Sequence, residues 1–297
     1  MSLKVWVLET RPNFLVLPVV LAVMGTSIAW YNGYFHFGNA LLAFFGLLLA
    51  HISVNTLNDY FDYKSGVDLA TKRTPFSGGS GMLPAALLKP EQVLRFGVIN
   101  FLLATAVGVY FLFTRGWLLL PVLLIAAVCI LLYTPFILKR QWPEWSPGLG
   151  LGILPILGLY FVQVSAYSWP LLVVSVIPGI LVHNLLLLNE FPDTEADKIA
   201  NRKTLPITIE KRKASIVYSV LTAIVYLWII GSVIAQLMPV YCLIALLTLP
   251  FAIKAIRGAL NPDDMSRLIP AMANNVLVVL LTPLLLGIGY ILATVFR

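Results

Sequence analysis

Residues 39–68 read NALLAFFGLLLAHISVNTLNDYFDYKSGVD, an apolar run that ends in a group of carboxylates. The apolar part, 39–58, has the length of about 20 residues that a helix needs to cross the hydrocarbon core of a bilayer. If the helix continues beyond it, Asn55, Asp59 and Asp62 stand at i, i+4 and i+7 and share one face. The stretch therefore predicts a membrane-spanning helix that presents carboxylates where it leaves the membrane.

The composition of the whole chain agrees with a membrane protein. The chain has 297 residues, of which 60% are hydrophobic and 11% charged, whereas a soluble domain carries about a quarter charged residues. The net charge of +7 is spread over short loops and forms no continuous stripe for a phosphate backbone, which argues against nucleic-acid binding. A chain this apolar needs lipid as its solvent.

Nine segments are apolar and long enough to span a bilayer. The predicted spans are 13–31, 39–58, 93–114, 117–136, 149–167, 169–189, 214–236, 239–257 and 269–295. No segment is left over for a soluble domain, so we expect an all-α integral membrane protein with one domain over 1–297.

The charged residues orient these spans. With nine spans the loops alternate between two sides, and of the 20 Lys and Arg residues all except Arg115 and Arg297 fall on the side of the N-terminus. By the positive-inside rule this side is predicted to be cytoplasmic. All 13 acidic residues fall on the same side, although the rule says little about Asp and Glu. We therefore expect the carboxylates on this side to have a functional role that the orientation of the spans does not explain.

A second carboxylate cluster ends the sixth predicted span. Residues 189–198 read NEFPDTEADK, with Asn189, Asp193 and Asp197 at i, i+4 and i+8, and with Pro192 as a predicted kink. Carboxylates one turn apart repel each other, and clusters at a low-dielectric boundary need cations. Mg²⁺, which is held by one or two carboxylates together with water and substrate phosphate, is the predicted ion. The alternative is that these carboxylates form salt bridges with Lys64, Lys198 and Arg202.

Basic and glycine-rich loops near the clusters are suited to a phosphate substrate. The basic residues in question are Lys72 and Arg73 after the first cluster, Lys198, Arg202 and Lys203 after the second, and Lys139 and Arg140 between the fourth and fifth spans. Arginine forks and lysine point charges bind phosphate oxygens, although a positive-inside protein carries such residues anyway. The run Gly78-Gly-Ser-Gly81 offers backbone N–H groups to an anion or is simply a flexible loop.

In these two clusters the sequence resembles the UbiA superfamily of intramembrane aromatic prenyltransferases. Further runs resemble the branch that prenylates 1,4-dihydroxy-2-naphthoate in menaquinone synthesis; these are 58–68, 79–83, 158–163, and Asp193-x-x-x-Asp197 followed by 202–205. The sequence departs from that branch at Pro192, where a basic residue is frequent, and at Glu190, where Asn is frequent. The stretch from Tyr133 to Lys139 is also longer than the matching element of many relatives.

The resemblance implies a nine-helix bundle with a central cavity that opens to the cytoplasmic side. It implies that Asp59, Asp62, Asp68, Asp193 and Asp197 help bind two Mg²⁺, which hold the diphosphate of a polyprenyl donor, with Asp59, Asp62, Asp193 and Asp197 as the catalytic set. The residues that we expect to contact substrate are Asn55, Asn58, Lys64, Lys72, Arg73, Tyr133, Lys139, Arg140, Tyr160, Gln163, Asn189, Lys198 and Arg202.

Several alternatives stay open at this point. The acceptor is 1,4-dihydroxy-2-naphthoate or, instead, 4-hydroxybenzoate, homogentisate, a chlorin or a glycerol-phosphate ether lipid. A secondary transporter is the rival class, although transporters place ionisable residues near the midplane of the bilayer. His51 and His183 either orient an acceptor or bond neighbouring helices. Arg11 is expected to be a topological anchor rather than a substrate contact.

Overall fold

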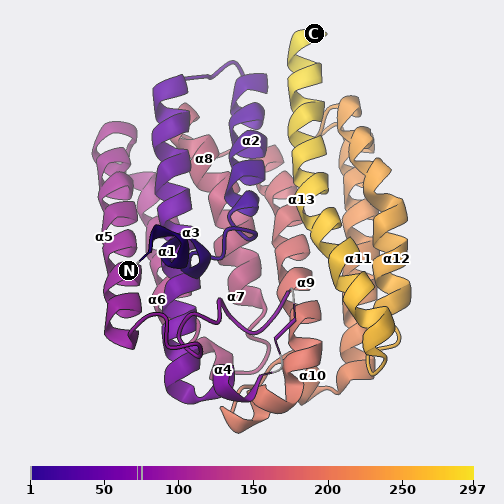
Figure 1. Cartoon of the computed structure of the whole chain (residues 1–297). Helices are drawn as coiled ribbons and strands as arrows, with labels where there is room; N and C mark the ends of the chain where they lie inside the picture. Colours follow the sequence, from indigo (N-terminus) through magenta and orange to yellow (C-terminus); the bar gives the residue numbers. More distant parts are fainter. Residues whose placement is uncertain (1, 72, 75) are drawn as a thin grey trace.

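The computed structural model describes residues 2–71, 73, 74 and 76–297, and the regular elements in these ranges are helical (Figure 1). The first half of the chain forms α1 (Leu3–Glu9), α2 (Val16–Tyr31), α3 (Phe37–Ser65), α4 (Val67–Ala70), α5 (Pro90–Arg115), α6 (Leu120–Leu132) and α7 (Trp145–Pro147). The second half forms α8 (Leu154–Val164), α9 (Trp169–Ile199), α10 (Leu205–Thr208), α11 (Lys211–Ile234), α12 (Leu249–Ala259) and α13 (Met265–Val295).

All nine predicted spans are helical, but they differ in length. In the described part of the chain, seven helices are long and apolar enough to cross a membrane: Phe37–Ser65, Pro90–Arg115, Trp145–Val164, Trp169–Ile199, Lys211–Ile234, Val240–Ala259 and Met265–Val295. The predictions at 13–31 and 117–136 correspond to the shorter apolar helices Val16–Tyr31 and Trp117–Leu132. The 16 residues of α2 extend over about 24 Å, less than the hydrocarbon core of about 30 Å.

Both carboxylate clusters lie on continuous helices. α3 runs through the first cluster to Ser65 and ends at Gly66, which takes the left-handed conformation (φ 81°) that glycine adopts without strain. α9 runs through Pro192 to Ile199, so the predicted kink does not end the helix. The helical spacing of both clusters therefore persists in the fold.

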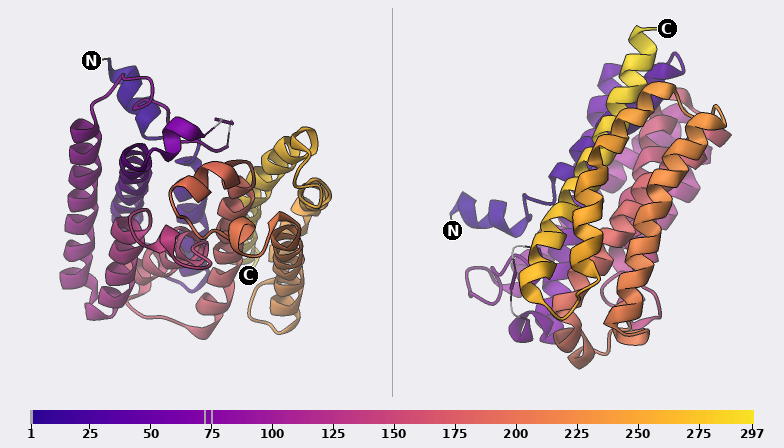
Figure 2. Two further views of the ribbon diagram at one scale, coloured as in Figure 1. Left: turned by 90° about the horizontal axis from the view of Figure 1, so that it is seen from below. Right: turned by 90° about the vertical axis from the view of Figure 1, so that its right-hand side faces the viewer.

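The ends of α3 and α9 that carry the clusters lie at the same end of the bundle. In Figure 1 they lie beside α4 and α10, away from the C-terminus and the loop that joins α2 to α3. Seen from that end, the helices surround a central region, with α3, α5 and α6 on one side and α11 to α13 on the other (Figure 2). The clusters can therefore act on one shared substrate.

The main hydrophobic core lies where α2, α8, α9 and α13 meet. Leu21 and Met24 of α2, Phe161 of α8, Ile177 of α9 and Leu286 of α13 are fully buried there. This core fixes α9 against the rest of the bundle, and with it the second carboxylate cluster.

A wide π-helical turn, Gly148–Ile153, brings the chain before α8 directly onto the backbone of α9. A Cβ atom on Gly152 would lie 2.6 Å from the carbonyl oxygen of Pro178 and 2.7 Å from Cα of Gly179. The two backbones touch because neither glycine has a side chain. This contact also brings Glu144 and Ser146, just before the turn, toward the middle of α9.

We expect Gly152→Ala to lower stability, because its Cβ meets backbone that cannot rotate away. Forced overpacking costs about 1–3 kcal/mol, measured as a lower melting temperature in detergent. The control is Gly231→Ala in α11, where the new Cβ has nothing within 4 Å and helix propensity favours alanine. Equal melting temperatures for the two variants would contradict the close contact between the turn and α9.

Candidate active site

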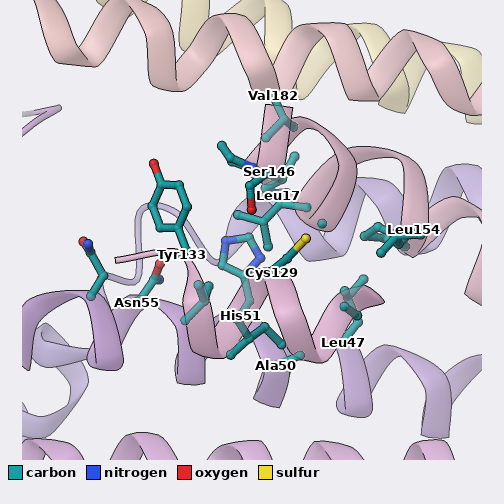
Figure 3. A pocket seen from close by; sticks show the side chains of 18 of the residues that line it. Leu17, Leu47, Ala50, His51, Asn55, Cys129, Tyr133, Ser146, Leu154 and Val182 are labelled. Atoms are coloured by element: carbon teal, nitrogen blue, oxygen red, sulfur yellow. The ribbon is translucent and has the colours of Figure 1, made fainter. Parts of the chain in front are cut away.

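A cavity of about 530 Å³ begins at the carboxylate clusters and continues between α3, α5, α6, α8 and α9. Its polar end includes the clusters, and its longer part is lined by apolar side chains such as Phe101, Leu123, Ile130 and Leu159. Figure 3 shows the stretch between the two parts, where His51, Tyr133, Ser146 and Cys129 gather around the cavity. The cavity thus joins a charged mouth to an apolar interior.

The first cluster is held from outside α3 by Arg11, which follows α1. Nη2 of Arg11 pairs with Asp59 and donates to Oδ1 of Asn58 at 3.2 Å. The amide of Asn58 donates in turn to Oδ2 of Asp62 at 3.1 Å and to Oγ1 of Thr134 at 3.0 Å. Arg11 was expected to be only an anchor. It is instead half-buried in the site, because the chain after α1 turns back over the end of α3.

Arg202 joins the two clusters. Its Nη2 pairs with Asp62 on α3, and its Nη1 donates to Oδ1 of Asp197 on α9 at 2.8 Å. Burial alone would lower the pKa of Arg202, but the carboxylates of Asp62 and Asp197 raise it above its ordinary value. The guanidinium therefore stays charged and fixes the ends of α3 and α9 relative to each other.

The glycine loop covers the first cluster. The exposed guanidinium of Arg73 donates to the carbonyl oxygens of Gly78 at 3.1 Å, Gly79 at 3.0 Å and Ser80 at 2.6 Å. The amide of Ser80 donates to Oδ2 of Asp59 at 2.9 Å. Arg73, predicted to bind phosphate, thus holds the shape of the loop and does not line the cavity.

Gly79 is where this loop comes closest to the carboxylates. A Cβ atom there would lie 3.1 Å from Oδ2 of Asp68 and 3.2 Å from Oδ1 of Asp59. Its φ of +67° is also in the left-handed region that favours glycine. Glycine at this position therefore lets the backbone close over Asp59 and Asp68.

The carboxylates suit a hard cation that the substrate helps to bind. In the described part of the chain, no group of three or more His, Cys, Asp and Glu side chains is placed to hold a metal ion. Asp193 nevertheless has a buried Oδ1 with no hydrogen-bond partner there. Burial, together with Asp62 and Asp59, raises the pKa of Asp68 to about 7. Because Mg²⁺ needs only one or two carboxylates when phosphate and water complete its shell, the residues fit this ion.

Nine of the 18 predicted site residues line the cavity, whereas Lys64, Lys139 and Lys198 do not. Those in its wall are Asn55, Asn58, Asp62, Asp68, Tyr133, Asn189, Asp193, Asp197 and Arg202, with Asp59 just behind. Lys64 and Lys139 line a separate cleft of about 220 Å³ beside Arg202. Lys198 pairs with Glu195 at 2.7 Å, and Arg140 lies 4.5 Å from the ring centre of Phe136. The prediction for Lys72 lies outside the described residues.

Tyr160 and Gln163 do not line the cavity, contrary to our expectation for α8. The hydroxyl of Tyr160 accepts from Nδ2 of Asn32 at 2.8 Å, and Oε1 of Gln163 accepts from the amide of His36 at 2.7 Å. Both contacts tie α8 to the loop between α2 and α3, at the other end of the bundle. The two residues lie about one turn apart on α8, and the face that they share points to this loop.

The two histidines have different surroundings. His51 lines the cavity (Figure 3). His183 lies outside its wall, and Nε2 of its ring accepts from Nε1 of Trp142 at 2.8 Å. The alternative of a hydrogen bond between neighbouring elements therefore describes His183, whereas His51 remains a candidate for contact with an acceptor.

Three buried acids are part of this region although the sequence patterns did not select them. Glu9 accepts from Oγ of Ser80 at 2.8 Å, and burial, followed by the charge of Asp59, raises its pKa to about 8. Glu144 accepts from the amide of Leu205 at 2.6 Å, and Glu190 lines the cavity. For Glu9 and Glu144 the only sequence signal was that all acidic residues fall on one predicted side, whereas Glu190 also stands within the second carboxylate cluster.

The comparisons with known proteins identify the family of this chain. The model of the UbiA prenyltransferase family matches residues 16–278. A 1,4-dihydroxy-2-naphthoate octaprenyltransferase from Bacillus subtilis is 27% identical over 287 residues, 96% of this chain and 91% of the relative. A digeranylgeranylglyceryl phosphate synthase from Thermococcus kodakarensis is 25% identical over 236 residues, 75% of this chain and 76% of the relative.

A solved structure has the same fold. It is that of a UbiA homolog from Archaeoglobus fulgidus bound to GPP and Mg²⁺, with a TM-score of 0.62 at 12% identity, and the match covers 95% of this chain and 99% of the homolog. The family resemblance predicted from the two carboxylate clusters is confirmed by the family model. The chain therefore belongs to the UbiA prenyltransferase family and is a membrane prenyltransferase enzyme.

Proposed function

We propose that the protein transfers a polyprenyl group from polyprenyl diphosphate to 1,4-dihydroxy-2-naphthoate, a reaction of menaquinone synthesis, and releases diphosphate. The observation that carries this proposal is the single cavity that joins the carboxylate–arginine mouth to an apolar interior. A polyprenyl diphosphate has the same division between a charged head and an apolar tail. The similarity to naphthoate prenyltransferases such as that of Bacillus subtilis supports the choice of acceptor.

The charged mouth is suited to the leaving diphosphate. We propose that Asp59, Asp62, Asp68, Asp193 and Asp197 hold two Mg²⁺, as the GPP- and Mg²⁺-bound homolog suggests. Bound there, the metal supplies positive charge that stabilises the negative charge developing on the diphosphate. Arg202 and Arg11 neutralise the carboxylates from behind and keep their oxygens in place.

The apolar interior is suited to the prenyl chain and to the carbon that becomes electrophilic. When the bond between C1 and the diphosphate oxygen breaks, the allylic carbon must meet the aromatic ring before it meets water. The side chains around the cavity exclude water, and the ring of Tyr133 lies at the junction of head and tail. Aromatic faces stabilise nearby positive charge.

Two further parts of the proposal concern the membrane and the acceptor. We propose that the charged mouth faces the cytoplasm of a cell membrane, as the distribution of Lys and Arg predicts. The alternative acceptor with support from the comparisons is a glycerol-phosphate ether lipid, because a digeranylgeranylglyceryl phosphate synthase is also similar to this chain. A transporter is no longer the rival reading, since the family is one of enzymes.

The first prediction concerns Asp193. Purified protein in nanodiscs should form prenylated 1,4-dihydroxy-2-naphthoate from a labelled polyprenyl diphosphate only when Mg²⁺ is present. Asp193→Asn should lower this rate about 100-fold, the scale of losing one group that stabilises developing charge. Its Oδ1 has no partner among the described residues, so the isosteric change should not disturb the fold.

The control is Asp263→Asn, which changes a carboxylate that is 86% exposed and far from the cavity wall. It should match the wild-type rate. Transfer that needs neither Mg²⁺ nor Asp193 would contradict the assignment of the mouth. Transfer to the glycerol-phosphate lipid but not to the naphthoate would contradict only the acceptor.

The second prediction concerns the length of the prenyl chain. Ala104 of α5 lines the apolar interior, whereas Ala106 is exposed and lies outside the cavity wall. Ala104→Phe should raise KM for octaprenyl diphosphate about tenfold, because overpacking costs about 1–3 kcal/mol, and should change KM for geranyl diphosphate little. Ala106→Phe should change neither value. An equal effect of Ala104→Phe on both donors would show that the chain does not run along α5.

A further inference from the structure

Glu190 is a cavity-lining carboxyl group whose surroundings do not satisfy it. It lies on α9, and only 7% of its surface is exposed. Both of its oxygens are buried, and neither has a hydrogen-bond donor among the described residues. An unsatisfied buried carboxyl costs free energy unless a ligand supplies the missing donor. The structure thus presents an acceptor group that faces the cavity without a partner.

Glu144 stands behind Glu190 and is itself fully buried. Its Oε1 accepts from the amide of Leu205, while its Oε2 has no partner in the described part of the chain. The two carboxyls lie within hydrogen-bonding reach of each other. Such a bond needs one proton for the pair, because two carboxylates in contact cannot both be charged. The pair then keeps a free oxygen on the side of Glu190 that faces the cavity.

The chemical groups around Glu190 determine which kind of ligand can bind there. A carboxyl pair repels the oxygens of a diphosphate, so the donor's head group is excluded from it. The neighbouring groups are the half-buried side chain of Tyr133 and the side chain of Asn189, whose Oδ1 also lacks a partner in the described residues. Oxygens without donors call for a ligand that presents O–H groups to them.

The position along α9 places such a ligand next to the reacting carbon. Glu190 precedes Asp193 by three residues, so the two side chains share one face of the helix. Asp193 belongs to the charged mouth, and Glu190 lies one turn deeper in the cavity wall. A hydroxyl group bound to Glu190 thus lies at the depth where the diphosphate of the prenyl donor joins its apolar chain.

We infer that Glu190, positioned by Glu144, binds a hydroxyl group of the aromatic acceptor and takes its proton during prenyl transfer; this inference rests on the proposed function. The O–H proton passes to the free carboxylate oxygen of Glu190, and the electron pair left on oxygen enriches the ring. A ring carbon forms the bond to C1 of the prenyl group as the C1–O bond breaks and diphosphate leaves with that electron pair. The ring carbon then loses a proton to the released diphosphate, or carbon dioxide where it carries a carboxylate. The ring is aromatic again, and the proton held by Glu190 returns to the aryl oxygen, which restores the hydroxyl group and the carboxylate.

The test compares an acceptor that has both hydroxyl protons with acceptors in which a methyl group replaces one of them. Wild-type protein in nanodiscs, with geranyl diphosphate as donor, is assayed with 1,4-dihydroxy-2-naphthoate and with each of its two monomethyl ethers. One ether should react about 100-fold more slowly, the scale of general base catalysis. Glu190→Gln should slow the diol about 100-fold and slow that ether little further, so that the ratio of the two rates falls toward one.

Controls separate chemistry from folding. Glu195→Gln changes an exposed carboxylate on the same helix and should match the wild type. Binding of geranyl diphosphate with Mg²⁺ to Glu190→Gln, measured by calorimetry, should also match the wild type. Glu144→Gln keeps an acceptor for Leu205 and offers an N–H to Glu190, so it should retain more activity than Glu144→Ala.

The outcomes distinguish this inference from the proposed function on which it rests. If wild-type protein prenylates the diol and Glu190→Gln keeps the wild-type ratio between diol and ethers, the inference is wrong and the proposed function stands. A variant that no longer binds geranyl diphosphate would give Glu190 a role at the donor and would also overturn the inference. Wild-type protein that prenylates no aromatic acceptor would contradict both.

Discussion

The ion pairs of Arg202 with Asp62 and Asp197 are the contact on which the arrangement of the site depends. They join α3 to α9, two helices whose carboxylates would otherwise repel each other across the mouth of the cavity. A buried ion pair gains little stability over apolar packing, because both charges lose water. Its value here is geometric, since a planar guanidinium with several donors holds two carboxylates at fixed positions. Arg11 does the same for Asp59 from the side of α1.

The pattern of apolar and acidic residues along the chain was enough to predict the helices that carry the site. The spans that end in Asp59 and Asp193 follow from apolar length and from carboxylates spaced one turn apart, both of which are properties of neighbouring residues. The lengths of α2 and α6 were harder to predict, because apolar residues continue past the points where turns end these helices. Helical spacing also tells which residues share a face but not what that face meets. Tyr160 and Gln163 illustrate this, since their common face meets the loop after α2.

The parts of the site that pattern did not predict are long-range contacts. Arg11 reaches Asp59 across 48 positions, and Arg202 reaches Asp62 across 140. Glu144 approaches Glu190 only because the turn at Gly152 presses its segment onto α9. Periodicity in the sequence does not predict such contacts, because they depend on how the helices pack. The family resemblance pointed to the metal-binding carboxylates and to Arg202 as a substrate contact, whereas Arg11 was expected to be an anchor and Glu144 was left unassigned.

The glycine loop over Asp59 and Asp68 limits which substitutions the protein can tolerate at these positions. Gly79 has a left-handed backbone, and a Cβ atom there would be closer than van der Waals contact to two carboxylates. A side chain on Gly81 would overlap the guanidinium of Arg73. A new residue at Gly81 requires the guanidinium of Arg73 to move away or Arg73 to be replaced, and either change frees three carbonyl groups at once. Substitutions at these two positions are therefore expected to be inherited together. An alignment of homologues should show them as a covarying pair.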